Sequence, residues 1–451
     1  MGRMSTKAVA AAIAVLLHLS VAASVLRQPL NLRAHPDAPR FLTWPLHFDS
    51  TYYNGPGIDF FAVYHAGVNS RSGVSPYSTY ERSGGATPYF FEFRYLPAVA
   101  STLGRVVSLV PPLAAYRAWV VVTELLFWFV ALVVLRGLWQ NPAGFVGWLA
   151  LVVSTPFFLE LHMGQFTFVT GALLGVALWL SRLGSTPRRR LGSRVAAGAV
   201  AATAVLLKLY PAVALLAWVR RRHLWLSLAV AATLIVCGGA LPFLARPQLW
   251  REFLAANAVV PPNPGNFGAL YVLHLVSEHF GFAPARDTWP LVVQLALAIS
   301  LGSAGLVVVL ARRRALYAET GVLLLAQLLA SFQVWEHHMS AAILAGAFLL
   351  LDFGRPASAT GQRARLPERF DRICAWTAAV SLVVLALPTP FALLGADLKS
   401  WTFLERMAVQ LTKPLPTLVL FVTGLAWLSR EGFAWPGTAR QGSPTDDSRA
   451  A

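Results

Sequence analysis

Solid runs of apolar residues recur along almost the whole chain and are separated by short polar stretches. Many reach about 18 residues or more, the length that an α-helix needs to cross a hydrocarbon core of about 30 Å. The pattern predicts an all-α, polytopic membrane protein. The apolar segments lie near residues 8–26, 96–110, 116–135, 143–161, 166–181, 195–219, 223–244, 290–311, 315–332, 338–353, 373–394 and 413–430.

Two of these segments contain features that interrupt a helix. Residues 96–112 include Pro97 near one end and two prolines at the other, and residues 195–219 are broken at 208–211, where Pro211 follows Tyr210. Interrupted helices at membrane depth are tolerated where they line a cavity or are buried in protein. We therefore expect ten full crossings and two broken or re-entrant hairpins, which gives about 10–12 transmembrane segments.

The positive charges favour one orientation in the membrane, because cytoplasmic loops are enriched in Lys and Arg. If both termini are cytoplasmic and both broken segments return to the side they came from, more than half of the 37 Lys and Arg fall on the cytoplasmic side. If both broken segments crossed fully, the arginines of 182–194 would face outward. The sequence thus predicts cytoplasmic termini and extracytoplasmic loops at 27–94 and 245–289.

These boundaries predict one integral-membrane catalytic domain, residues 1–438. The first apolar run, 8–26, reads as a retained anchor rather than a cleaved signal peptide, because the run is long and the remaining chain is membrane-embedded. The last stretch, 439–451, is rich in Gly, Ser, Pro and Asp, and predicts a disordered cytoplasmic tail.

Composition narrows the class further. The chain is 56% hydrophobic and 13% charged, whereas soluble proteins carry about 25% charged residues. Its net charge of +17 resides mostly in loops between apolar segments, so it indicates membrane orientation and not a nucleic-acid partner. Cys237 and Cys374 both lie in or at the end of apolar segments, which predicts neither a disulfide framework nor a metal site.

Asp59 is the first candidate for chemistry, in the predicted outer loop. It is framed by Phe60, Phe61 and Tyr64, and partial desolvation of its carboxylate would raise its pKa and make it a better general base. The other interpretation is an N-cap, because Asp is favoured at the start of a helix. The two roles are compatible.

Lys208 is the second candidate, because it lies inside an apolar run. A lysine at that depth is costly and indicates a functional site, with an anion such as phosphate as its partner. A lysine near a helix end that extends to the interface is the alternative. Pro211 favours a break here, and Tyr210 lies beside it.

His337 and His338 open the apolar segment near 338–353, directly after Trp335 and Glu336. Both could bond a phosphate or another part of a substrate. They could equally be an interfacial pair. With Glu336 they resemble a metal-ligand set, but adjacent histidines on a helix point about 100° apart, and the His-x-x-x-His spacing of metal sites is missing. We predict no metal site.

Further polar residues are predicted to face the same side. Gln165 could bind a sugar hydroxyl or satisfy nearby backbone, and His162 lies in the same short turn. Arg94 could offer a fork to phosphate or pair with Glu92 at the interface. Tyr95 suits either an interfacial aromatic belt or stacking on a sugar. Tyr64 and Asn266 are further supporting candidates. No phosphate-binding Gly-rich loop or nucleophile elbow occurs, so an activated substrate would arrive in the membrane.

Taken in order, these motifs resemble glycosyltransferase family 87 of the GT-C enzymes, which includes polyprenyl-phosphate-mannose-dependent α-mannosyltransferases. The similar stretches begin at Asp59-Phe60 and end at Trp335-Glu336-His337-His338. Between them come Gly73-Val74-Ser75-Pro76-Tyr77, Phe93-Arg94-Tyr95-Leu96-Pro97, Gly164-Gln165 and Leu207-Lys208-Leu209-Tyr210-Pro211.

The resemblance implies a GT-C fold with a large first extracytoplasmic loop. It implies Asp59 as the base of an inverting transfer, and Lys208 with His337 and His338 near the donor phosphate. The implied reaction moves a hexose, mannose by resemblance, from a polyprenyl-phosphate donor to a lipid-linked or envelope-glycan acceptor, without a cofactor, at the plasma membrane of a bacterium. A polyprenyl-phosphate-arabinose-dependent arabinofuranosyltransferase is the alternative within the class. A transporter or flippase for a lipid-linked solute is the alternative outside it.

Overall fold

The computed structural model describes residues 5–29, 55–78, 90–183, 186–259, 266–354, 369–390 and 401–433. The proposed tail at 439–451 lies outside these ranges. The first half contains α1 (Thr6–Arg27), α3 (Ile58–Arg71), α4 (Pro97–Val99), η3 (Ala100–Gly104), α5 (Arg105–Val107), α6 (Pro112–Phe129), η4 (Val130–Val134), η5 (Arg136–Gln140), α7 (Pro142–Val152), α8 (Thr155–Met163), α9 (Thr167–Leu180) and α10 (Pro187–Leu207).

The second half is also helical and ends in a bent pair of helices. It contains η6 (Tyr210–Leu215), α11 (Leu216–Val219), η7 (Arg222–Leu224), α12 (Trp225–Ala245), α13 (Gln248–Ala256), α14 (Ala269–His279), η8 (Arg286–Thr288), α15 (Trp289–Leu310), α16 (Leu316–Leu329), η9 (Glu336–His338), α17 (Met339–Phe353), α18 (Arg369–Ala386), α19 (Phe403–Gln410) and α20 (Pro414–Ser429).

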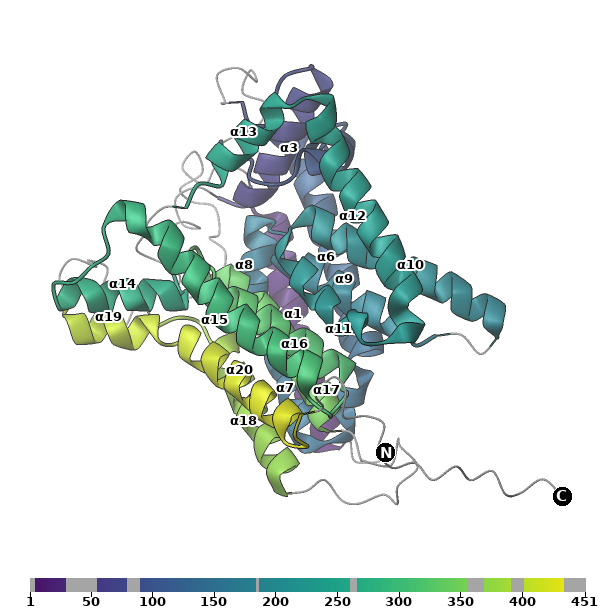
Figure 1. Ribbon diagram of the computed structural model, residues 1–451, viewed down its shortest axis with the longest axis vertical. Helices are drawn as coiled ribbons and strands as arrows, with labels where there is room; N and C mark the ends of the chain where they lie inside the picture. Colours follow the sequence, from purple (N-terminus) through teal and green to yellow (C-terminus); the bar gives the residue numbers. More distant parts are fainter. Residues whose placement is uncertain are drawn as a thin grey trace.

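The predicted all-α, polytopic membrane class is confirmed. Among the described residues, six helices are long and apolar enough to cross a membrane, and the α19–α20 pair, bent by 47°, would make a seventh. Each predicted apolar segment overlaps a helix, but α9, α16 and the 210–219 stretch are shorter than a full span. Figure 1 shows α9, α16 and α17 in the middle of the molecule, with α10 and α12 on one side of them and α14 and α19 on the other. The number of complete crossings remains a prediction.

The core is built around α17. All fifteen residues of this helix are buried, so a helix of this composition needs no polar face. Gly346 on α17 allows α18 to approach closely, because a Cβ there would come within 2.6 Å of Leu382. Ala345 and Gly321 provide a similar close contact between α17 and α16. This packing fixes the position of the first residues of α17, which directly follow His338 in the chain.

The predicted break at Lys208 is present. α10 ends at Leu207, and Lys208 adopts an extended conformation with φ −157° and ψ 124°. Pro211 has no amide hydrogen to bond to the carbonyl of Leu207, so a continuous helix would lose a bond there. Gly198 and Leu206 on α10 lie against residues 227 and 238 of α12 respectively, so α10 and α12 run parallel. Residues 210–219 therefore return along the bundle. α10 itself, with 21 residues, is long and apolar enough to cross a membrane, so the expectation that 195–219 does not cross fully stays a prediction.

The second predicted hairpin, 96–112, forms a short helical stretch over residues 97–107 and then turns into α6. It supports α3, the helix of the first polar loop. Gly67 of α3 lies against Gly104, where an added Cβ would be only 2.0 Å from the Gly104 carbonyl oxygen. Side chains as small as hydrogen are required at this crossing, and they allow α3 to lie close to the bundle.

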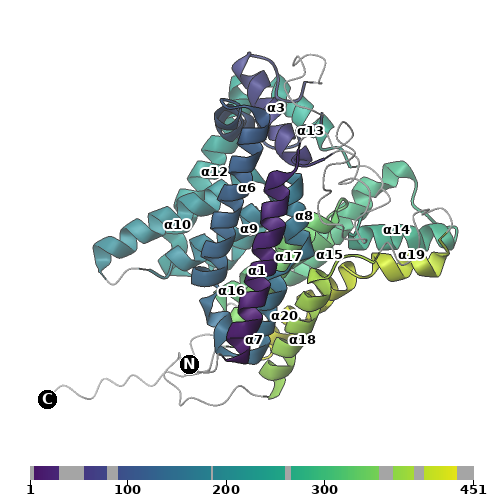
Figure 2. The same ribbon diagram turned by 180° about the vertical axis from the view of Figure 1, so that it is seen from behind.

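The N-terminal helix α1 runs along the outside of the bundle (Figure 2). It is anchored by His18, which is fully buried. The Nδ1 atom of His18 lies 2.6 Å from the carbonyl oxygen of Val152, and its Nε2 atom lies 3.0 Å from Glu124 on α6. Val152 is the last residue of α7, so His18 bonds a carbonyl at the break between α7 and α8.

Candidate active site

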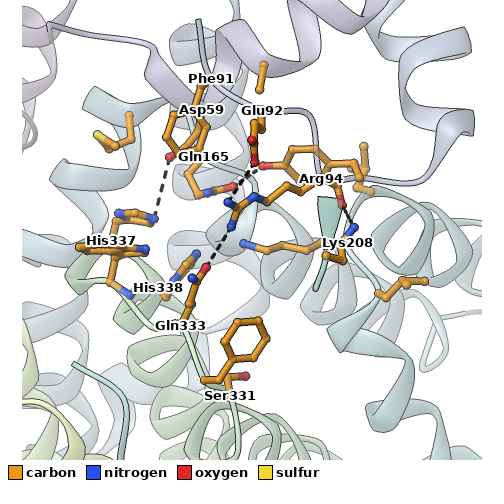
Figure 3. Close-up of a pocket in the computed structure, with 18 of the residues that line it drawn as sticks. Asp59, Phe91, Glu92, Arg94, Gln165, Lys208, Ser331, Gln333, His337 and His338 are labelled. Atoms are coloured by element: carbon orange, nitrogen blue, oxygen red, sulfur yellow. Dashed lines mark hydrogen bonds and ion pairs between the residues drawn. The ribbon is translucent and has the colours of Figure 1, made fainter. Parts of the chain in front are cut away.

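A cavity of about 580 Å³ opens where the first loop, the α8–α9 turn, the Lys208 break and the segment before α17 meet. Its wall is apolar for the most part, with a few polar side chains pointing inward (Figure 3). Nine of the polar residues singled out from the sequence line it: Asp59, Glu92, Arg94, Tyr95, Gln165, Lys208, Glu336, His337 and His338. The fold therefore brings together residues that are up to 279 positions apart, from 59 to 338.

Asp59 is placed by the first turn of α3. Gly57 is the N-cap of this helix, with φ 83°, a left-handed conformation that glycine adopts at low cost. Its amide donates to the carbonyl oxygen of His162 at 2.7 Å, which fixes α3 on the end of α8. The N-cap interpretation of Asp59 is thus wrong, because Asp59 is the second residue inside the helix.

The Asp59 carboxylate is buried without full hydrogen bonding. The residue is 7% exposed, and its Oδ2 atom has no hydrogen-bond partner among the described residues. Burial raises the pKa of Asp59 from 3.8 to about 6, and the charges of Lys208 and Arg94 limit the rise. A carboxylate with a pKa near 6 is mostly ionised at neutral pH and is a stronger base than an exposed one.

His337 faces Asp59 across the cavity (Figure 3). Its Nε2 atom lies 3.9 Å from Oδ2 of Asp59, and this nitrogen also has no hydrogen-bond partner among the described residues. Burial, together with the nearby charge of Lys208, lowers the pKa of His337 to about 3. At neutral pH the contact therefore joins a carboxylate and a neutral imidazole, and both have bonding capacity left for a substrate.

Lys208 points into the cavity from the break after α10. Its Nζ atom donates to the hydroxyl of Thr167, at the start of α9, over 2.7 Å. Tyr210 supports the same turn from outside the cavity lining, since its hydroxyl donates to the carbonyl oxygen of Thr167 at 2.8 Å. Lys208 has two further N–H groups to offer an anion.

The rim of the cavity is formed by Arg94 and its partners. Arg94 donates to the side chain of Gln333 at 3.0 Å and pairs with Glu92 at 3.3 Å. Deeper in the wall, the hydroxyl of Tyr95 donates to Gln165 at 2.7 Å. Arg94 is thus both an interfacial ion pair and a lining residue, and Tyr95 lies in the cavity wall.

His338 is fixed by local backbone. Its Nδ1 atom accepts a bond from the amide of Trp335 at 3.0 Å, which leaves the other ring nitrogen for the cavity. Within the described ranges, no group of three His, Cys, Asp or Glu side chains is arranged to hold a metal ion.

Four predicted candidates do not line the cavity: Tyr64, His162, Tyr210 and Asn266. Tyr64 is five residues after Asp59, so at 3.6 residues per turn it faces about 140° away, and its hydroxyl bonds the Val110 carbonyl at 2.9 Å. His162 is buried in the α8 end. The side chain of Asn266 binds the backbone of Phe332 at 2.6 Å and so braces the segment before η9.

Three residues near the site were given no role from the sequence. Glu160 is fully buried at the end of α8 and accepts bonds from the amide of Phe168 and the hydroxyl of Ser340. Lys413 is equally buried and pairs with Glu336 at 3.1 Å. Gln333 bonds Arg94 at the rim. For the first two, the available signal was a charged residue within or beside an apolar run.

Fold and cavity together define a polytopic membrane protein with a polar site held between α3 and the break after α10. A sequence model of glycosyltransferase family 87 matches residues 95–334. This stretch is more than half of the 451-residue chain. The chain belongs to glycosyltransferase family 87, and the protein is a membrane glycosyltransferase.

Two solved structures are similar at low identity. Apo ArnT from Cupriavidus metallidurans is 16% identical, with a TM-score of 0.37 over 82% of this chain and 73% of that chain. ArnT from the same organism bound to undecaprenyl phosphate is 17% identical, with a TM-score of 0.41 over 92% of this chain and 77% of that chain. No curated protein sequence matches the chain significantly.

Proposed function

We propose that this glycosyltransferase moves a hexose, mannose by motif resemblance, from a polyprenyl-phosphate donor to a hydroxyl of a lipid-linked or envelope-glycan acceptor. The observation that carries the proposal is one cavity holding a buried, incompletely bonded Asp59 and the ammonium of Lys208. A base and an anion-binding cation are what an inverting transfer from a sugar phosphate requires.

The reaction is a single displacement. The acceptor oxygen forms a bond to the anomeric carbon as the bond from that carbon to the phosphate oxygen breaks, and the configuration inverts. The acceptor proton passes to Oδ2 of Asp59, the oxygen that has no hydrogen-bond partner among the described residues. The neutral Nε2 of His337, 3.9 Å away, can hold the same hydroxyl in place before transfer.

The leaving group gains a negative charge in this step, because a phosphodiester becomes a phosphomonoester. Lys208 supplies a positive charge where that charge develops, and it needs no proton transfer to do so. Thr167 holds its Nζ atom at 2.7 Å, so the ammonium is oriented before the donor binds. Arg94 at the rim offers a second, planar donor.

The apolar part of the cavity suits a polyprenyl chain. Leu207 and Leu209 flank Lys208, and Val293 and Leu297 of α15 line the wall nearby. α12 and α15 expose most of their apolar side chains on the outside of the bundle. A donor lipid could therefore lie with its tail against these helices and its phosphate at Lys208.

The donor is tested directly. Purified protein is incubated with polyprenyl-phosphate mannose and, separately, with polyprenyl-phosphate arabinose, and labelled sugar is followed into membrane lipid fractions. We expect transfer from the mannosyl donor. Transfer from the arabinosyl donor alone would show that the sugar is arabinose and not mannose. Translocation of labelled lipid without any transfer would favour the transporter alternative.

The proposed orientation places the cavity mouth outside the plasma membrane and both termini in the cytoplasm. A cysteine replaces Glu92 or Arg188, both exposed, in a background in which the exposed Cys237 has become serine. An impermeant thiol reagent added to intact cells should label position 92 and not position 188. The reverse pattern would invert the topology.

A further inference from the structure

Lys413 lies at the bend between α19 and α20, far along the chain from the residues that the family model matches. The whole residue is 0% exposed. A buried ammonium is costly unless it is paired and its N–H groups are bonded. The burial of Lys413 therefore needs a physical explanation, which the burial of an apolar residue would not.

All three N–H groups of Lys413 have a partner. Its Nζ atom donates to the carbonyl oxygen of Leu385 at 2.9 Å and to that of Leu387, and it pairs with Oε1 of Glu336 at 3.1 Å. Leu385 is in the last turn of α18 and Leu387 directly follows this helix, where Pro388 prevents the helix from continuing. Lys413 thus joins the end of one helix, the bend of another, and the segment before α17.

Glu336 is held from two sides. Besides Lys413, it accepts a bond from the amide of Thr389 at 3.2 Å. It is the first residue of η9, and the next residue is His337, whose Nε2 atom faces Asp59. Because η9 is only three residues long, the anchoring of Glu336 sets the position of the His337 ring.

We propose that Lys413 and Glu336 are positioning residues that hold η9 so that His337 faces Asp59. This inference rests on the proposed role of Asp59 as the base. It gives the C-terminal helices a part in the active site, although none of the described residues beyond 338 lines the cavity. The alternative is that Glu336, which also lines the cavity, contacts the substrate itself.

The test uses three variants of the full-length protein: Lys413→Met, Glu336→Gln, and the double variant. Lys413→Met leaves the Glu336 charge unpaired, so η9 should shift, and a misplacement of about 1 Å near reacting groups can cost on the order of 10²-fold in kcat. The KM for the donor should stay close to that of the wild type, because Lys208 is untouched. The double variant leaves no unpaired charge and should recover about tenfold in kcat relative to Lys413→Met.

Thr417→Val is the matched control. Thr417 is one turn further along α20 and is also buried, and its hydroxyl contacts Met339 on α17 and the carbonyl oxygen of Lys413 but not the Lys413 ammonium. It should keep wild-type kcat. Wild-type kcat in Lys413→Met, or no recovery in the double variant, would overturn the proposal, and the second result would indicate that Glu336 contacts the substrate.

Hydrogen exchange provides a readout that needs no sugar donor. Backbone amides of residues 335–340 should exchange faster in Lys413→Met and in the double variant than in Thr417→Val, with residues 57–62 unchanged. If Lys413→Met does not fold, the double variant carries this comparison. Unchanged exchange at 335–340 overturns the positioning role, whereas absence of transfer by wild-type protein would count against the proposed function only.

Discussion

Two buried carboxylates lie at the ends of neighbouring helices and differ in what their oxygens bond. Glu160 on α8 is 0% exposed and both of its oxygens accept a hydrogen bond, from Phe168 and from Ser340. Asp59 on α3 is 7% exposed, and its Oδ2 has no such partner among the described residues.

The difference separates two uses of a buried acid. A carboxylate whose oxygens are both satisfied holds its neighbours together, because each bond links a different segment. Glu160 joins α8, α9 and α17, and Thr167, beside Phe168, is the residue that holds Lys208. A carboxylate with a free lone pair that faces a cavity can accept a proton from a substrate. We infer a structural role for Glu160 and a chemical role for Asp59.

The largest effect is expected for Asp59→Asn. The amide keeps the size of the side chain but cannot accept the acceptor proton, and loss of general-base help costs roughly 10²–10⁴-fold in rate. Transfer by purified enzyme should fall by this amount, with protein level and donor binding retained. Tyr64→Phe, a change on the opposite face of α3, is the control. Near-normal transfer by Asp59→Asn would show that Asp59 is not the general base.

Lys208→Ala should have the next largest effect. The variant loses a charged hydrogen-bond donor, worth about 1.5–3 kcal/mol, or roughly 10- to 100-fold in kcat/KM. Both kinetic constants should change: the KM for the donor should rise and kcat should fall, because the ammonium holds the phosphate before and during transfer. Steady-state kinetics with varied donor measure both. An unchanged donor KM would show that Lys208 only supports the break after α10.

The pH dependence should follow the Asp59 carboxylate. Its pKa is raised to about 6, and the base must be ionised, so activity is present above pH 6 and falls as pH decreases through 6. Below the pKa, kcat/KM should drop about tenfold per pH unit. A pH–rate profile checks this limb. A profile flat down to pH 4.5 would mean that Asp59 titrates at its ordinary value or is not the base.

The smallest effect is expected for Glu160→Gln. A glutamine can accept from the Phe168 amide and donate to the Ser340 oxygen, so both links survive, and the loss in kcat should stay well below that of Asp59→Asn. Glu160→Leu removes both links and leaves the buried amide of Phe168 without this partner. It should lower the free energy of unfolding by about 1–3 kcal/mol. Loss of activity in Glu160→Gln as large as in Asp59→Asn would erase the distinction between the two acids.

The sequence alone determined the class of the protein. Runs of apolar residues predict membrane helices because the bilayer imposes their length, and Pro211 predicts the break at Lys208 because proline lacks an amide hydrogen. The ordered motifs from Asp59 to His338 predicted the family. Asp59, Lys208 and His337 could be grouped because the predicted orientation of the helices puts their loops on one side of the membrane, and all three line the cavity.

The tertiary structure alone decided which side chains in those loops face the cavity. Tyr64, His162 and Asn266 occur in the loops that surround the cavity but do not line it. The direction of a side chain depends on the rotation of its helix and on its hydrogen bonds to neighbouring backbone. The Glu336–Lys413 pair was invisible for a related reason. Hydropathy reports the depth of a residue in the membrane, whereas a contact between residues 77 positions apart depends on how the helices between them pack.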